Sequence, residues 1–119
     1  MRISELSAKT QVSVHRLRRY EADGLIESQR LPNGYRDYEE RTVRHVIFIA
    51  MSREMGFSLP FIAVYLPRSK AGKLSAQDMI EAILARVAEI DQLISEQHAL
   101  RQKLMDHIGW FKTQARRKP

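Results

Sequence analysis

The chain opens with MRISELSAKTQVSVHRLRRYEADGLI, residues 1–26, and this stretch predicts its architecture. Its first apolar residues predict a short helix over roughly residues 4–9. Ser13 can accept a backbone N–H, so it is a good N-cap for a second helix over about residues 14–22. Gly24 stands where such a helix ends. Two short helices joined by a turn of three or four residues form a helix-turn-helix.

A hairpin is predicted after this motif. The segment RLPNGYRDY, residues 30–38, has Asn33-Gly34 near its centre. Asn and Gly both tolerate positive φ, which makes this dipeptide the strongest short hairpin signal. The hairpin is expected to be a small two-stranded wing with basic and aromatic residues beside its tip.

Two further helices are expected next. Apolar residues at helical spacing predict a helix over about residues 40–55, and Gly56 stops it. Ser58 is the expected N-cap of a fourth helix, with Pro60 in its first turn, where a missing N–H is harmless. Pro67 is expected to end that helix, because proline has no N–H to continue the hydrogen-bond ladder.

The second half of the chain predicts one long helix. The winged helix-turn-helix domain is expected over residues 1–67, a polar connector over 68–74 and a dimerisation helix over 75–111, about 50 Å long at roughly 1.5 Å per residue. Polar Gln97 and Arg101 interrupt its heptad seam. So long a helix cannot bury its apolar stripe against so small a domain, which predicts a mainly α fold with a homodimeric coiled coil. The seam consists of Ile80, Ile83, Val87, Ile90, Ile94, Leu104 and Ile108.

The net charge indicates a polyanionic partner but does not locate the contact. The 119 residues carry 20 Lys and Arg against 14 Asp and Glu, a net charge of +6. Nucleic acid is the first candidate partner and a membrane surface the second. Residues 1–67 hold ten basic and eight acidic residues, so the clustering of arginines is more informative than the total. The basic tail, residues 112–119, is interpreted as a disordered solubilising end, with an additional phosphate contact as the alternative.

Composition excludes several classes of site. Cysteine is absent, which excludes disulfides, zinc fingers and thiolate metal sites within this sequence. The histidines lack metal-ligand spacing, and no nucleophile–base pair or phosphate loop stands out. We therefore expect no enzymatic activity, no cofactor and no metal site. No apolar run is long enough to span a bilayer, and the first residues lack the apolar core of a signal peptide, so we expect a cytoplasmic protein without a membrane partner.

These ordered motifs resemble the MerR family of transcriptional regulators. Residues 1–26 resemble the start of that family. The segment GYRDY, residues 34–38, resembles its wing pattern Gly-Tyr-Arg-x-Tyr, and residues 43–59 are similar as well. The likeness covers residues 1 to about 66. Several motifs in the expected order make it more specific than any one of them alone.

The departures from the family pattern are informative. Gln11 stands in the turn where the family usually has Gly, so it must tolerate an unusual backbone or shift the turn slightly. Arg19 replaces an aromatic residue and adds a charge close to the expected DNA side. None of these departures removes the fold.

Side chains on the second helix and the hairpin are candidate DNA contacts. His15 and Arg16 lie near the start of that helix, where recognition helices touch bases. The resemblance implies backbone contacts from Arg18 and Tyr20, phosphate contacts from the wing and a second wing at the turn before the fourth helix. A core role for Tyr20 and pairing of Arg36 with Asp37 or Glu39 are the alternatives. The candidate set is His15, Arg16, Arg18, Arg19, Tyr20, Arg30, Tyr35, Arg36 and Arg53.

The end of the long helix leaves two interpretations open. Trp110 and Phe111 either pack as an apolar plug or help to form an effector pocket with His98 and His107.

The sequence therefore predicts a dimeric, sequence-specific DNA-binding transcriptional regulator whose partner is double-stranded DNA. The resemblance implies that the dimer bends and undertwists a promoter with an overlong spacer, so that RNA polymerase can engage it. Related metal and thiol sensors use cysteines that this sequence lacks, so the effector stays unknown. The alternatives are a MerR-like protein adaptor of the chaperone-modulator type and a DNA-binding accessory factor such as an excisionase.

Overall fold

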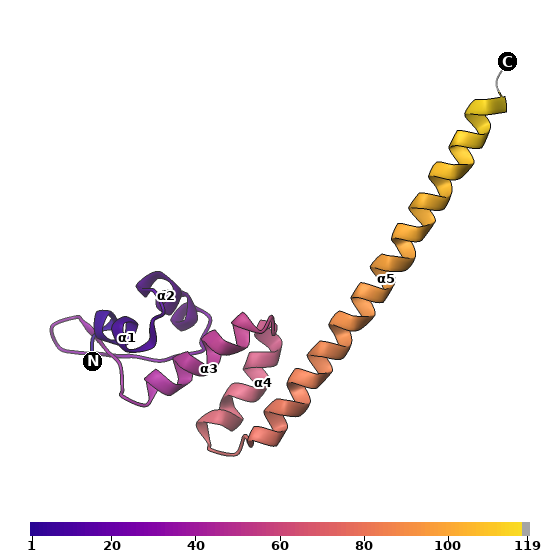
Figure 1. The fold of residues 1–119 in the computed structure, drawn as a ribbon. Coiled ribbons are helices and arrows are strands. Elements are labelled where there is room, and N and C mark those ends of the chain that lie inside the picture. Colours follow the sequence, from indigo (N-terminus) through magenta and orange to yellow (C-terminus); the bar gives the residue numbers. More distant parts are fainter. Residues whose placement is uncertain (118–119) are drawn as a thin grey trace. The chain divides into compact units, whose positions relative to one another are not determined.

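The computed structural model describes residues 1–117, which divide into two compact units, Met1–Ser75 and the residues from Ala76 onward. The first unit holds four helices and a two-stranded sheet, and the second is a single helix (Figure 1). The order of these helices and strands confirms the predicted mainly α fold. The elements are α1 (Ile3–Thr10), α2 (Val14–Ala22), β1 (Gln29–Arg30), β2 (Arg36–Asp37), α3 (Thr42–Glu54), α4 (Leu59–Lys70) and α5 (Ala76–Arg117).

The helix-turn-helix forms as the sequence predicts. Ser13 is the N-cap of α2, and its hydroxyl accepts the backbone N–H of Arg16 at 3.2 Å. Leu6 of α1 and Leu17 of α2 are fully buried, and the two helices pack against each other. Gln11 ends α1 with a φ of +61°, so the turn keeps a left-handed residue although its side chain is not glycine.

The wing is a short antiparallel hairpin, also as predicted. Arg30 pairs with Arg36 across β1 and β2. At its tip the backbone N–H of Tyr35 donates to Asn33 Oδ1 at 3.1 Å, and Gly34 adopts a φ of +85°. The Met1 nitrogen donates to Asp37 Oδ1 at 2.8 Å and to the Tyr38 carbonyl at 2.7 Å, which holds the base of the wing against the first residues.

The fourth helix corrects one expectation. Ser58 caps α4 by accepting the Phe61 N–H at 3.3 Å, but the helix continues past Pro67 to Lys70. Proline removes only its own N–H, while its carbonyl still accepts the Ala71 N–H at 3.0 Å. Pro67 therefore lies within the helix, and the connector expected over residues 68–74 is shorter than predicted.

The core of the first unit lies among its four helices and the wing base. Its fully buried side chains come from α1 to α4, from the segment between α2 and β1 and from the segment after β2, so these parts share one core. These side chains are Leu6, Leu17, Ile26, Tyr38, Val46, Ile49, Ser52 and Ile62.

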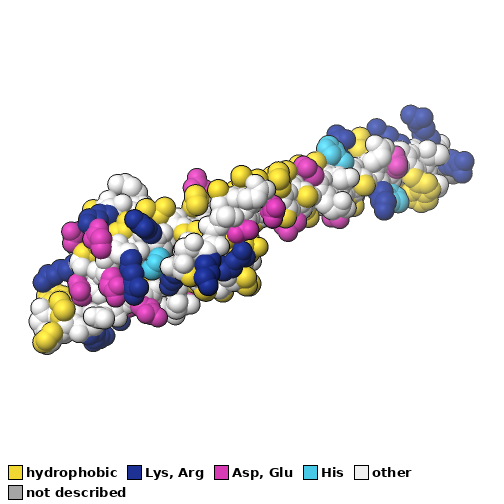
Figure 2. All heavy atoms as spheres, turned by 90° about the horizontal axis from the view of Figure 1, so that it is seen from below, with side chains coloured by type: hydrophobic (Ala, Val, Ile, Leu, Met, Phe, Trp, Pro, Cys, Tyr) yellow, Lys and Arg dark blue, Asp and Glu magenta, His cyan; other side chains and the backbone are white. Residues whose placement is uncertain are grey.

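The second unit is a 42-residue helix, about 63 Å long at roughly 1.5 Å per residue. It has no buried residue, and its predicted seam is between 37% and 58% exposed. Figure 2 shows hydrophobic side chains in yellow along this helix.

Residues 112–117 of the basic tail are helical, which corrects the expectation of disorder there. The rest of that tail lies outside the described residues.

Within residues 1–117, no helix is long and apolar enough to cross a membrane.

Candidate nucleic-acid interface

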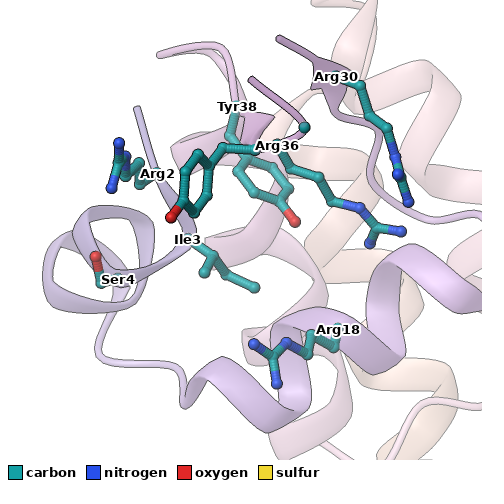
Figure 3. A pocket seen from close by; sticks show the side chains of 9 residues that line it. Arg2, Ile3, Ser4, Arg18, Arg30, Arg36 and Tyr38 are labelled. Atoms are coloured by element: carbon teal, nitrogen blue, oxygen red, sulfur yellow. The ribbon is translucent and has the colours of Figure 1, made fainter. Parts of the chain in front are cut away.

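Four arginines meet in one concavity of the first unit. Arg2 comes from the segment before α1, Arg18 from α2, and Arg30 and Arg36 from the two wing strands. In Figure 3 Arg18 lies on the helix below, with Arg30 and Arg36 on the strands above. The concavity has a volume of about 560 Å³ and is completed by Ile3, Ser4, Gly34, Tyr35 and Tyr38. We call these nine residues the arginine cradle.

The wing is attached to α2 through one carboxylate. Glu21 accepts a hydrogen bond from the Tyr38 hydroxyl at 2.7 Å and forms an ion pair with Arg36. Burial, followed by the hydrogen bond to Glu21, raises the pKa of the Tyr38 hydroxyl above its ordinary value of 10.0. Arg36 therefore pairs with a carboxylate of α2, not with its neighbours Asp37 or Glu39, and this pairing orients its guanidinium within the cradle.

Arg2 is a cradle residue that the sequence reasoning missed. Its guanidinium lies 4.4 Å from the centre of the Tyr35 ring, a cation–π contact between the first residues and the wing tip. No local pattern marks Arg2, because its position depends on the pairing of Met1 with the wing base. Neighbouring arginines that are not all neutralised by carboxylates create a positive potential, which favours an anion. None of the described residues forms an ion pair with Arg2, Arg18 or Arg30.

The predicted contacts of α2 divide into three groups, and the first is Arg18, which lines the cradle. His15, Arg16 and Arg19 are exposed on the helix and lie outside the cradle lining. Tyr20 is only 7% exposed, and its hydroxyl is buried with no hydrogen-bond partner among the described residues. The structure thus supports the core alternative for Tyr20 and leaves its neighbours free to reach a partner.

Arg53 is separate from the cradle. Its Nη1 donates to the Phe57 carbonyl at 3.2 Å, across the turn between α3 and α4. This hydrogen bond holds the turn that precedes the N-terminus of α4. The other guanidinium N–H groups stay available, so Arg53 can be both a structural clamp and an anion contact.

The end of α5 does not assemble the alternative effector pocket within one chain. Trp110 and Phe111 pack edge to face with ring centres 4.9 Å apart, and both are exposed. His98 lies twelve residues before Trp110 on the same helix, which separates them by about 18 Å along its axis. Across the described part of the chain, no three His, Asp or Glu side chains are grouped to hold a metal ion.

Comparison with known proteins identifies the family of the chain. The chain matches the family descriptions "MerR family regulatory protein" over residues 2–38 and "MerR, DNA binding" over residues 43–107. It is 33% identical to the mercuric resistance operon regulatory protein of Bacillus cereus, over 88% of this chain and 80% of that protein.

Solved structures show the same fold. The transcription regulator PbrR691 from Ralstonia metallidurans CH34, solved with lead(II), matches 89% of this chain and 83% of its own, with a TM-score of 0.70 and 29% identity. HiNmlR, a MerR family regulator lacking the sensor domain and bound to promoter DNA, has a TM-score of 0.59 and 18% identity, with coverage of 87% and 77%. The winged helix-turn-helix, the arginines gathered beside it and both family matches lead to one conclusion: the chain belongs to the MerR family and is a DNA-binding transcription regulator.

Proposed function

We propose that the chain reads a specific operator as a homodimer, with α2 in the major groove and the arginine cradle on the adjacent phosphate backbone. The four converging arginines carry this proposal, because phosphate contacts supply most of the affinity of DNA-binding proteins. The exposed His15 and Arg16 lie in the first turn of α2, where recognition helices read base edges. Arg19 adds charge on the same helix.

The homodimer is proposed from the surface of α5. Its seven seam residues are all exposed in the single chain, and Leu93 and Leu100 widen the apolar stripe. A soluble helix with such a stripe gains free energy by burying it against a second helix with the same heptad pattern. A two-fold pair of winged units would match an operator made of two related half-sites.

Promoter bending is the proposed mode of action. Bending the DNA between two half-sites costs free energy. A dimer that holds both half-sites through its wings can offset this cost with the additional contacts that bending permits. RNA polymerase at the deformed promoter, in the cytoplasm, is the proposed downstream partner.

The names of the relatives mention mercury and lead, but these 119 residues offer no cysteine, so we propose no thiolate-bound metal effector. The adaptor alternative explains neither the cradle nor the DNA-binding family match.

Titration of the protein against its own promoter tests the contact. Arg18→Ala and Arg36→Ala should each weaken binding about tenfold or more, and each should lower the slope of affinity against salt by about one phosphate contact. Lys103→Ala removes one charge from an exposed position of α5 and is the matched control. Unchanged affinity and salt slope in both cradle variants would overturn the proposed interface.

A further inference from the structure

A second cavity lies in the first unit, where α3 begins and α4 ends. It has a volume of about 490 Å³, within the range of small-molecule sites. The cradle and this cavity share no lining residue. Its charged or titratable lining consists of Glu27, Glu39, Arg41, Arg44, His45 and Lys70. We call it the α3–α4 cavity.

Two of the three cations of this cavity have a partner in the fold. Lys70 Nζ donates to the Leu25 carbonyl at 3.2 Å, which fixes its ammonium at the cavity and leaves two N–H donors. Arg41 Nε lies 2.6 Å from Glu39 Oε2. Arg44 has no ion pair among the described residues. The first turn of α3 contains no acidic residue, so its positive dipole end adds to the same charge.

The pKa of His45 indicates which sign of charge dominates in this cavity. Burial, followed by the charges of Lys70 and Arg41, lowers the pKa of the imidazole below its ordinary value of 6.5, while Glu39 acts in the opposite sense. Arg44 from α3 and Glu27 from the segment after α2 complete the charged surroundings. The cations therefore outweigh the carboxylates at the imidazole, and a negatively charged group is favoured there.

We propose that the α3–α4 cavity binds a small organic anion, carrying a carboxylate or phosphate together with hydroxyl or amino groups. Arg44 and Lys70 bind the anionic group, and Glu27 accepts hydrogen bonds from the hydroxyl or amino groups. The two carboxylates make the cavity a poor match for the DNA backbone, because a row of phosphates would be repelled by them. Glu39 directly follows Tyr38, a cradle residue, so one short segment joins the cavity to the proposed DNA contact.

The test is a titration of the full chain with inorganic phosphate and with citrate, followed by NMR of the histidine C–H signals. His45→Gln assigns the signal, and sodium chloride at equal ionic strength is the control. We expect saturable shifts of the His45 signal and a rise in its pKa with either anion. A response that does not saturate, or that chloride reproduces, would overturn the proposal.

Two variants separate this site from the cradle. Arg44→Ala, which removes an exposed side chain, should weaken phosphate and citrate binding about tenfold, and Glu27→Gln should strengthen it. Lys103→Ala should change neither. Unchanged anion binding in Arg44→Ala would overturn the proposal, and so would weaker operator binding with a lower salt slope, which would assign Arg44 to the DNA contact instead. Arg18→Ala should reduce operator binding and leave anion binding intact. That result would show that the α3–α4 cavity binds anions independently of the cradle.

Discussion

Arg2 illustrates how a single exposed charge becomes part of a site through its neighbours. It has no helical or hairpin signature, yet the pairing of Met1 with the wing base brings its guanidinium onto the Tyr35 ring. Glu21 acts similarly for Arg36, since it ties the wing to α2 through two contacts. Both residues show that the cradle depends on contacts between segments far apart in the sequence.

Replacement of Arg2 measures this contribution directly. Arg2→Ala should weaken operator binding about tenfold and lower the salt slope by about one phosphate contact, because it removes a cation beside the proposed backbone contact. Fluorescence anisotropy at several salt concentrations checks this. Arg2→Lys keeps the charge but not the planar stack on Tyr35, so it should retain the salt slope and recover part of the affinity. An Arg2→Ala variant that binds like the unaltered protein would remove Arg2 from the interface.

Gln11 carries a local cost that glycine would relieve. A side chain at φ +61° costs roughly 1 kcal/mol relative to glycine, part of which glycine loses again through the greater entropy of the unfolded chain. Gln11→Gly should therefore raise the free energy of unfolding by about 0.5 kcal/mol, measured by urea denaturation. Gln11→Ala keeps the strained conformation and should give no gain. Destabilisation by glycine would mean that the Gln11 side chain contributes more than its hydrogen bond to the Ala8 carbonyl suggests.

The helices differ in what holds them. The caps of α2 and α4 are local, and both form where the sequence has serine. The end of α4 was predicted wrongly, because a proline in the last turn leaves the following N–H groups able to bond. The long α5 carries its apolar stripe without burial, so the proposed dimerisation would stabilise this helix.

A charge in the seam tests that link. Ile90→Asp should yield monomers, because burying a carboxylate among apolar side chains costs several kcal/mol. Molar mass from light scattering gives the answer. Ala99→Asp adds the same charge at an exposed position outside the heptad seam and should remain a dimer. A dimeric Ile90→Asp protein would contradict the seam.

In the whole molecule, the winged unit and the helix are two compact bodies with separate tasks. The first gathers charge into the cradle, and the second carries an exposed apolar stripe, which we propose is covered by a second copy. In the homodimer that we propose, two winged units are linked through their long helices. An operator for such a protein must have its half-sites in a matching phase along the DNA helix.

The spacing of the half-sites tests this consequence. Insertion of about five base pairs, half a turn of DNA, rotates one half-site to the opposite face of the duplex. Affinity should then fall to that of a single half-site, and insertion of a full turn should recover part of it. Equal affinity at all spacings, measured on operators of equal length, would show that the two winged units bind independently.

The elements of this fold follow from short-range signals in the sequence. Ser13 and Ser58 start helices, Asn33-Gly34 closes the hairpin and the heptad residues form one face of α5, because each signal acts within a few residues of backbone. The sequence left two alternatives at Gln11, an unusual backbone or a shifted turn, and the structure supports the first. The family and the class of function were predictable from these ordered motifs.

Contacts between segments far apart in the sequence determine which side chains of the site are buried and which are paired. Burial of Tyr20, pairing of Arg36 with Glu21 and entry of Arg2 into the cradle depend on which distant segments meet. A sequence pattern lists the charges available but not their partners, because an arginine can pair with any carboxylate that folding brings within reach. Packing of the wing base against α2 and the first residues selects those partners, and this selection gathers surface arginines into the cradle that we propose contacts DNA.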